Sequence, residues 1–148
     1  MQSGSVSDER GWTDLGGTTV KPGGPRVLVI DDDPRVKESL SAMIEREGWS
    51  FYGADNVEEA VAAVNDIQPE VIVLEPRADR GRAAALLIDV HQAGVWIPVL
   101  LYTSDSSIDD AYALEHGASG VIKKPLGEAL LREHIGKLLN RRETDRPL

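Results

Sequence analysis

Four consecutive apolar residues, Val71 to Leu74, constrain the fold of this chain more than any other feature. The run reads V-I-V-L, follows Pro69 and stops at Glu75. A strand with one wet face alternates apolar and polar residues, whereas a strand buried on both faces is apolar throughout. We therefore expect Val71 to Leu74 to form a central strand, covered on both sides, that ends in a carboxylate at a polar edge.

Four more strands are expected, and helical patterns separate them. The other strands are expected at 26–30, 49–54, 97–102 and 120–122, with apolar residues at helical spacing within 34–48, 56–64, 83–94, 108–117 and 128–139. Asp33 before Pro34 is typical of a helix start, and Asn56 with Glu59 resembles a capping box. Strands that alternate with helices through long connections form a parallel sheet with helices on both faces. The predicted fold is therefore doubly wound α/β.

The ends of the chain differ in composition from its middle. Residues 1–25 are rich in glycine, serine and threonine and poor in apolar residues, so we expect a disordered tail there. Residues 26–139 hold all the strand and helix patterns and are expected to form one domain. A charged, frayed tail is expected at 140–148.

The composition excludes several classes of protein. The chain of 148 residues has no cysteine, so disulfides, thiolate metal sites and cysteine nucleophiles are excluded. Its apolar runs are far shorter than the roughly 20 residues of a membrane span. A net charge of -9 disfavours contact with nucleic acid or anionic lipid. We therefore expect a cytoplasmic protein whose partners are other proteins.

All the expected strands except the second end beside a side chain that can bind a ligand. Asp31 and Asp32 follow the first strand, Glu75 the third, Thr103 the fourth and Lys124 the fifth. In doubly wound sheets, ligands bind outside the carboxyl ends of the strands. Magnesium prefers oxygen ligands, so the convergent carboxylates suggest a magnesium site.

The order of these residues resembles the response-regulator receiver domain of two-component signalling. D-D, T-S and K-P occur in that order on successive strand ends, with G-A-S-G before the fifth strand. The resemblance covers the chain from Arg26 to about Leu139. It implies a flavodoxin-like, five-stranded parallel sheet in the order 2-1-3-4-5.

The resemblance also implies roles for single residues. In that family the positions of Asp31 and Asp32 bind magnesium, with the backbone carbonyl at the position of Arg77 as a further ligand. The position of Glu75 accepts a phosphoryl group from a histidine kinase.

In the family, two further positions contact the phosphoryl group, and a third carries an aromatic side chain that moves when the group is bound. The position of Thr103 hydrogen-bonds the phosphoryl group and that of Lys124 pairs with it. Val121 stands where the family usually has an aromatic switch residue, so a coupled threonine–aromatic motion is not expected.

Glu75 is the main departure, because the family carries an aspartate at this position. One extra methylene moves the carboxylate about 1.5 Å outward, and in-line phosphoryl transfer tolerates such misplacement badly. Phosphorylation at Glu75 is therefore not expected, and magnesium binding is expected to be weak or absent. The guanidinium of Arg77 could fold into the acidic pocket and neutralise it.

Several interpretations of Glu75 stay open. It could mimic a phosphorylated aspartate, or form a structural ion pair with Lys124 in a domain that no longer switches. The second is favoured, because a glutamate carries one negative charge and a phosphoryl group nearly two. A functional, magnesium-dependent phosphoacceptor in a phosphorelay is the alternative. Asp79 is a weaker candidate acceptor, since it lies in a loop.

We accordingly predict a non-enzymatic signalling module, a pseudo-receiver that acts by contact with a histidine kinase or a downstream signalling protein. The resemblance implies a homodimer surface on the fourth helix, fifth strand and last helix. His91, His116 and His134 lie on different helices, and we interpret them as surface residues.

Overall fold

The computed structural model describes residues 24–92, 96–125 and 127–145. Strands and helices alternate along these residues without exception. The strands are β1 (Arg26–Ile30), β2 (Ser50–Ala54), β3 (Val71–Leu74), β4 (Val99–Thr103) and β5 (Gly120–Lys123). The helices are α1 (Pro34–Arg46), α2 (Val57–Ile67), α3 (Ala83–Gln92), α4 (Asp110–His116) and α5 (Glu128–Asp145). The tail predicted at 1–25 lies almost entirely outside the described residues, as does the helix stop predicted at Gly94.

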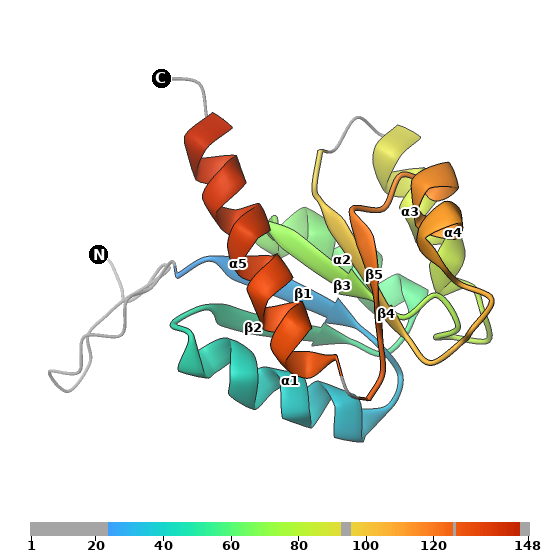
Figure 1. The fold of residues 1–148 in the computed structure, drawn as a ribbon, viewed down its shortest axis with the longest axis horizontal. Helices are drawn as coiled ribbons and strands as arrows, with labels where there is room; N and C mark the ends of the chain where they lie inside the picture. The colour runs from blue at the N-terminus through green and yellow to red at the C-terminus, as the bar shows by residue number, and fades with distance from the viewer. Residues whose placement is uncertain (1–23, 93–95, 126, 146–148) are drawn as a thin grey trace, which may run out of the picture.

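The strands form one parallel sheet in the order β2-β1-β3-β4-β5, as predicted. β3 lies in the centre, with Val73 opposite Val29 of β1 on one side and Leu100 of β4 on the other. All four residues of β3 are buried, which confirms the interpretation of the V-I-V-L run. Figure 1 shows the strands as neighbouring arrows, with α5 crossing in front of them.

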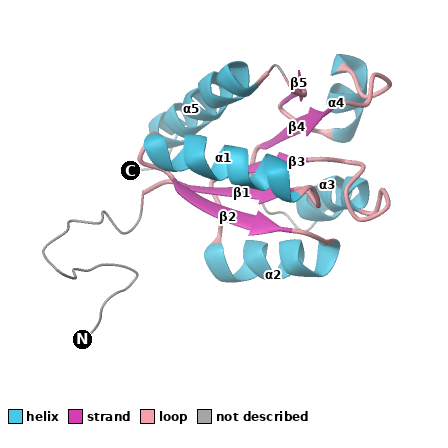
Figure 2. Ribbon diagram, turned by 90° about the horizontal axis from the view of Figure 1, so that it is seen from below, coloured by secondary structure: helices cyan, strands magenta, loops and turns pink. Residues whose placement is uncertain are grey.

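Alternate residues of the central strands feed two separate hydrophobic clusters. Val71 and Val73 face a cluster that includes residues of α1 and α5, whereas Ile72 and Leu74 face a cluster with residues of α2, α3 and α4. Figure 2 shows α1 and α5 on one face of the sheet and α2 on the opposite face. Both faces are thus covered, which is why these strands can be apolar throughout.

The helix starts follow the sequence signals. The carboxylate of Asp33 accepts from the backbone N–H of Arg35 at 2.9 Å, and Pro34 opens α1. The side chain of Asn56 accepts from the N–H of Glu59 at 2.8 Å. The Glu59 carboxylate reaches back to the N–H of Asp55, one residue before the expected Asn56, at 2.7 Å.

The last helix is longer than the sequence analysis predicts. We expected it to end at about Leu139, but α5 continues to Asp145 through residues assigned to a frayed tail. Residues 140–145 contain neither glycine nor proline, and the next proline is Pro147, so nothing local ends the helix earlier.

Among the described residues, no helix combines the length and apolarity that crossing a membrane requires.

Candidate functional site

The backbone of the sheet places the predicted side chains at one edge. Asp31 lies one residue beyond β1, and its N–H donates to the carbonyl of Ala54 at 3.1 Å. The N–H of Glu75 donates to the carbonyl of Ile30 at 2.9 Å. The N–H of Lys124 donates to the carbonyl of Thr103 at 3.1 Å. The ladder bonds thus continue past the strand ends and fix the residues that carry the polar side chains.

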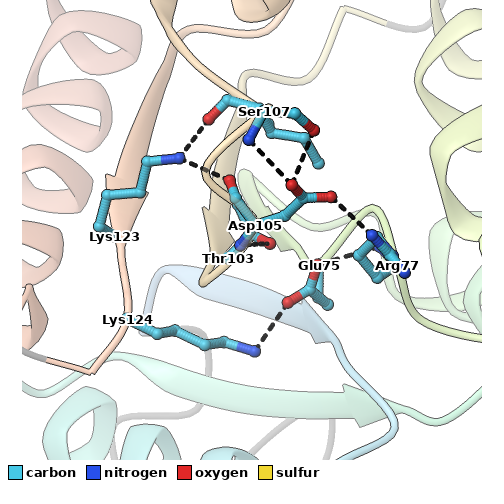
Figure 3. Close-up of polar contacts among 8 residues, drawn as sticks. Glu75, Arg77, Thr103, Asp105, Ser107, Lys123 and Lys124 are labelled. Atoms are coloured by element: carbon cyan, nitrogen blue, oxygen red, sulfur yellow. Dashed lines mark hydrogen bonds and ion pairs between the residues drawn. The ribbon is translucent and has the colours of Figure 1, made fainter.

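Lys124 joins the carboxylates of two different strands. Its Nζ lies 2.7 Å from Oδ2 of Asp31 and 2.9 Å from Oε1 of Glu75. Only 3% of Asp31 and 7% of Glu75 is exposed, so both ion pairs are largely shielded from water. Figure 3 shows the Lys124 side chain reaching toward Glu75. The structure therefore brings together Asp31, Glu75 and Lys124 as predicted.

Burial and ion pairing shift the pKa values of Asp31 and Lys124 in opposite directions. Burial raises the pKa of Asp31, and the hydrogen bonds from Lys124 and from the N–H of Asp33 only partly offset that effect. Burial alone would lower the pKa of Lys124, but its bonds to Asp31 and Glu75 outweigh burial and raise that pKa. The ammonium is consequently held in its charged form.

Arg77 does not place its guanidinium in this pocket, so that expectation is wrong. Nη1 of Arg77 pairs with Oδ2 of Asp105 at 2.7 Å, and the side chain is 70% exposed. The residue meets the pocket through its backbone instead, because its N–H donates to Oε2 of Glu75 at 2.9 Å (Figure 3). The carboxylate of Asp105 is more accessible than those of Asp31 and Glu75, and the sequence analysis did not indicate its contact with Arg77.

Asp32 lies at the exposed side of the pocket and has a different partner. Its Oδ2 accepts from the backbone N–H of Asp79 at 2.9 Å. The carboxylate of Asp79 points away from the pocket: its Oδ2 accepts from the N–H of Val57 at 3.0 Å and from Nη1 of Arg82 at 2.9 Å. Asp79 is thus tied to α2, a long-range contact that its loop position did not predict.

Thr103 is fully buried, and its hydroxyl belongs to the loop that follows β4. Oγ1 accepts from the N–H of Asp105 at 3.1 Å. Nζ of Lys123 donates to the carbonyl of Asp105 at 2.7 Å and to the carbonyl of Ile108. Figure 3 shows these contacts around the loop. The β4–α4 loop is therefore held by Thr103 of β4, by Lys123 of β5 and by Arg77 of the loop that follows β3.

The comparisons with known proteins agree with this architecture. The family model described as "Response regulator receiver domain" matches residues 27–136. This chain belongs to the response regulator receiver domain family.

Among curated relatives of this receiver domain, the transcriptional regulatory protein TrcR of Mycobacterium tuberculosis is 30% identical over 124 residues, 82% of this chain and 48% of TrcR. The alkaline phosphatase synthesis transcriptional regulatory protein PhoP of Bacillus subtilis is 26% identical, over 82% of this chain and 51% of PhoP. The chain thus spans about half the length of these relatives.

Solved structures show the same fold. A CheY-like response regulator receiver domain protein from Methanospirillum hungatei JF-1 superposes with a TM-score of 0.75 at 22% identity, covering 83% of this chain and 99% of the other. The Francisella response regulator receiver domain gives a TM-score of 0.73 at 24% identity, covering 80% and 98%.

The predicted magnesium ligands of this receiver domain are engaged by groups of the chain itself. Lys124 binds Asp31 and Glu75, the N–H of Arg77 binds Glu75, and the N–H of Asp79 binds Asp32. The carbonyl of Arg77, the further predicted ligand, accepts from the N–H of Gly81 at 3.0 Å. Across 24–92, 96–125 and 127–145, no three carboxylate or imidazole side chains are arranged to hold a metal ion. As they lie, these residues do not fit a divalent cation.

Val121 lies in β5 of the receiver domain, opposite Leu101 of β4. Its side chain packs against the hydrophobic cluster that contains residues of α2, α3 and α4. A branched aliphatic side chain at this position has no polar end that could alternate between the core and the surface. The prediction that the domain lacks a threonine–aromatic switch therefore rests on residue type alone.

The contacts described for His116 and His134 do not involve the residues at this edge of the sheet. The ring Nδ1 of His116 bonds the carbonyl of Tyr112 at 2.8 Å, and that of His134 bonds the carbonyl of Leu130 at 3.0 Å. Each therefore bonds its own helix, and both residues are half-buried. The side chain of His91 lies outside the described residues.

Proposed function

We propose that this receiver domain is a signalling module that is not phosphorylated at Glu75 and works by protein–protein contact. It is a pseudo-receiver, and we propose no catalytic activity for it.

The state of the Glu75 carboxylate carries this proposal. A nucleophilic oxygen must approach phosphorus in line and unshielded. In Glu75, Oε1 is paired with Lys124 and Oε2 accepts from the N–H of Arg77, while the residue is only 7% exposed. Both oxygens of Glu75 are therefore engaged in contacts that would have to break before any transfer.

The same contacts favour a structural role for Glu75 over mimicry of a phosphorylated state. Glu75 and Asp31 share the one positive charge of Lys124, so the carboxylate of Glu75 is held in an ion pair of the pocket itself. The Thr103 hydroxyl accepts from the N–H of Asp105, which engages it with the loop. A phosphoryl group carries nearly twice the charge and more acceptor oxygens, which a lone carboxylate does not supply.

The partners and the location follow the same proposal. We propose a cytoplasmic domain that contacts a histidine kinase or a downstream signalling protein, and that binds neither nucleic acid nor membrane through 26–139. The relatives TrcR and PhoP are named as transcriptional regulatory proteins, and we do not extend that role to this domain. A homodimer would use the face of α4, β5 and α5, where Leu114 is 83% exposed.

The test is incubation of the whole chain with magnesium and acetyl phosphate, followed by intact-mass measurement. We expect no gain of a phosphoryl group at any time point. The variant Glu75→Gln is the matched control, because it keeps the size of the side chain and removes the nucleophile. A gain in the wild type that Glu75→Gln abolishes would identify a working phosphoacceptor and overturn the proposal.

A further inference from the structure

The loop between β3 and α3, residues 76–82 and hereafter the β3–α3 loop, has an unusual backbone. Three consecutive residues are left-handed, with φ of 55° at Asp79, 57° at Arg80 and 84° at Gly81. Only glycine enters this region without a steric penalty from its side chain. Two residues with side chains keep such a conformation only where the surrounding contacts enforce it.

The carboxylate of Asp79 supplies the contacts that anchor this loop. Its Oδ2 accepts from the N–H of Val57, the first residue of α2, at 3.0 Å, and from Nη1 of Arg82 at 2.9 Å. Nη2 of Arg82 continues to Glu58 at 2.8 Å. A carboxylate is favourable at a helix N-terminus, where backbone N–H groups lack partners within the helix. The loop is therefore fixed to α2 from outside the pocket.

The backbone of the same loop faces inward. The N–H of Asp79 donates to Oδ2 of Asp32, and the N–H of Arg77 donates to Oε2 of Glu75, both at 2.9 Å. Lys124 serves Asp31 and the other oxygen of Glu75. Each of the three carboxylates predicted to bind magnesium thus receives a hydrogen bond from the chain, and two of them receive one from the β3–α3 loop.

We propose that the β3–α3 loop is a built-in substitute for a divalent cation, and that the carboxylate of Asp79 locks it in place. The loop supplies N–H dipoles where a magnesium ion would supply charge, and the anchor to α2 prevents Asp32 from exchanging the N–H for a metal. The proposal goes beyond the proposed function, because it concerns cation binding and does not depend on whether Glu75 is ever phosphorylated.

The experiment compares two glycine substitutions in the whole chain. Asp79→Gly keeps the backbone N–H and the left-handed conformation but removes the anchor. Arg80→Gly, the matched control, relieves the same conformation at the neighbouring residue, whose side chain is exposed. Binding is measured by titration with Mn²⁺, read as paramagnetic broadening of the amide signals of Asp31 and Asp32, and by the rise of Tm in Mg²⁺.

We expect Asp79→Gly to bind Mn²⁺ at least about tenfold more tightly than the wild type, a change typical of groups that position metal ligands. Arg80→Gly should match the wild type. Charge alone predicts the opposite order, since Asp79→Gly removes a negative charge and Arg80→Gly a positive one. A wild type that binds as tightly as Asp79→Gly, equal gains in both variants, or no gain in either would each overturn the proposal.

A second pair of variants decides the matter if Asp79→Gly fails to fold by circular dichroism. Arg82→Gln breaks the ion pair that holds the Asp79 carboxylate, and Arg80→Gln removes the same charge from a neighbouring position. Tighter Mn²⁺ binding in Arg82→Gln than in Arg80→Gln supports the proposal, and equal binding overturns it. Neither result bears on phosphorylation, so the proposed function stands or falls by the mass measurement alone.

Discussion

Lys124 supplies the ammonium that lies between two buried carboxylates of the pocket. Its Nζ lies within 2.9 Å of both Asp31 and Glu75. Removing one partner of a buried ion pair leaves charge that is neither hydrated nor matched, which costs more than the pair itself contributes. The stability of the domain and the state of Glu75 are therefore linked through this one side chain.

Lys124→Met should lower the free energy of unfolding by about 3 kcal/mol, since Asp31 and Glu75 would face each other unpaired. Urea denaturation measures the change, with Lys137→Met as the control for loss of an exposed lysine from α5. Adding Glu75→Gln to Lys124→Met should recover part of the loss, because one of the unpaired charges disappears. Equal losses in Lys124→Met and Lys137→Met would contradict the prediction.

Asp105 gives the β4–α4 loop a contribution to stability that depends on pH. Hydrogen bonds from Ser107, together with the Arg77 guanidinium, lower the pKa of Asp105 from 3.8 to about 2. Because the folded state favours the charged form, the stabilisation is complete above pH 3.8 and is lost as the pH falls toward about 2.

Asp105→Asn should therefore lower the urea midpoint at neutral pH, and its difference from the wild type should shrink below pH 3.8. The measurement is a series of urea melts between neutral and acidic pH. Asp110→Asn, at an exposed position in the same region, serves as the control. A difference that stays constant down to the acidic end would show that the charge of Asp105 is not responsible.

At the scale of elements, the chain is packed more tightly at Gly127, just before α5, than at Gly136 inside it. A Cβ added to Gly127 would clash with Cγ2 of Ile122 and lie 2.7 Å from the carbonyl oxygen of Lys123. A Cβ added to Gly136, inside the helix, would meet only Trp49, with its nearest atom at 3.8 Å. A side chain is therefore excluded by close packing at Gly127, whereas Gly136 has room for one.

Alanine at these positions should have opposite effects. Gly127→Ala is expected to destabilise the domain by about 1 to 3 kcal/mol, because the start of α5 cannot approach β5 as closely. Gly136→Ala is expected to stabilise it by about 0.5 to 1 kcal/mol, since alanine is the better helix former. Thermal unfolding of both variants measures the difference in sign, and a shift in the same direction for both would refute the packing argument.

For the whole molecule, local features and the gathering of the strand ends were predictable, whereas the individual contacts that side chains make with distant residues were not. The apolar run of β3 and the Asp33–Pro34 helix start carry their own explanation. The strand-end residues were predictable as a group, because a parallel sheet brings its carboxyl ends together. The direction of Arg77 depends on Asp105, which is 28 residues away, and no local pattern reports it.

The anchoring role of Asp79 was missed for the same reason. Its carboxylate meets Val57, 22 residues earlier, and its N–H meets Asp32, 47 residues earlier. The sequence marks the segment only as a polar loop. A left-handed aspartate beside an arginine and a glycine is compatible with many loop conformations, so tertiary contacts decide among them.

The central strands contribute side chains to both hydrophobic clusters, so the two faces should unfold together. Leu87→Ala, on the α3 face, is expected to cost about 2 to 5 kcal/mol. Trp49 packs against the cluster on the opposite face and can report its unfolding by fluorescence. In a background with Trp12→Phe and Trp96→Phe, Leu87→Ala should lower the midpoint seen by Trp49 and the midpoint seen by circular dichroism equally. Ile44→Ala, on the Trp49 face, is the control, and separate midpoints in Leu87→Ala would mean that the two layers unfold independently.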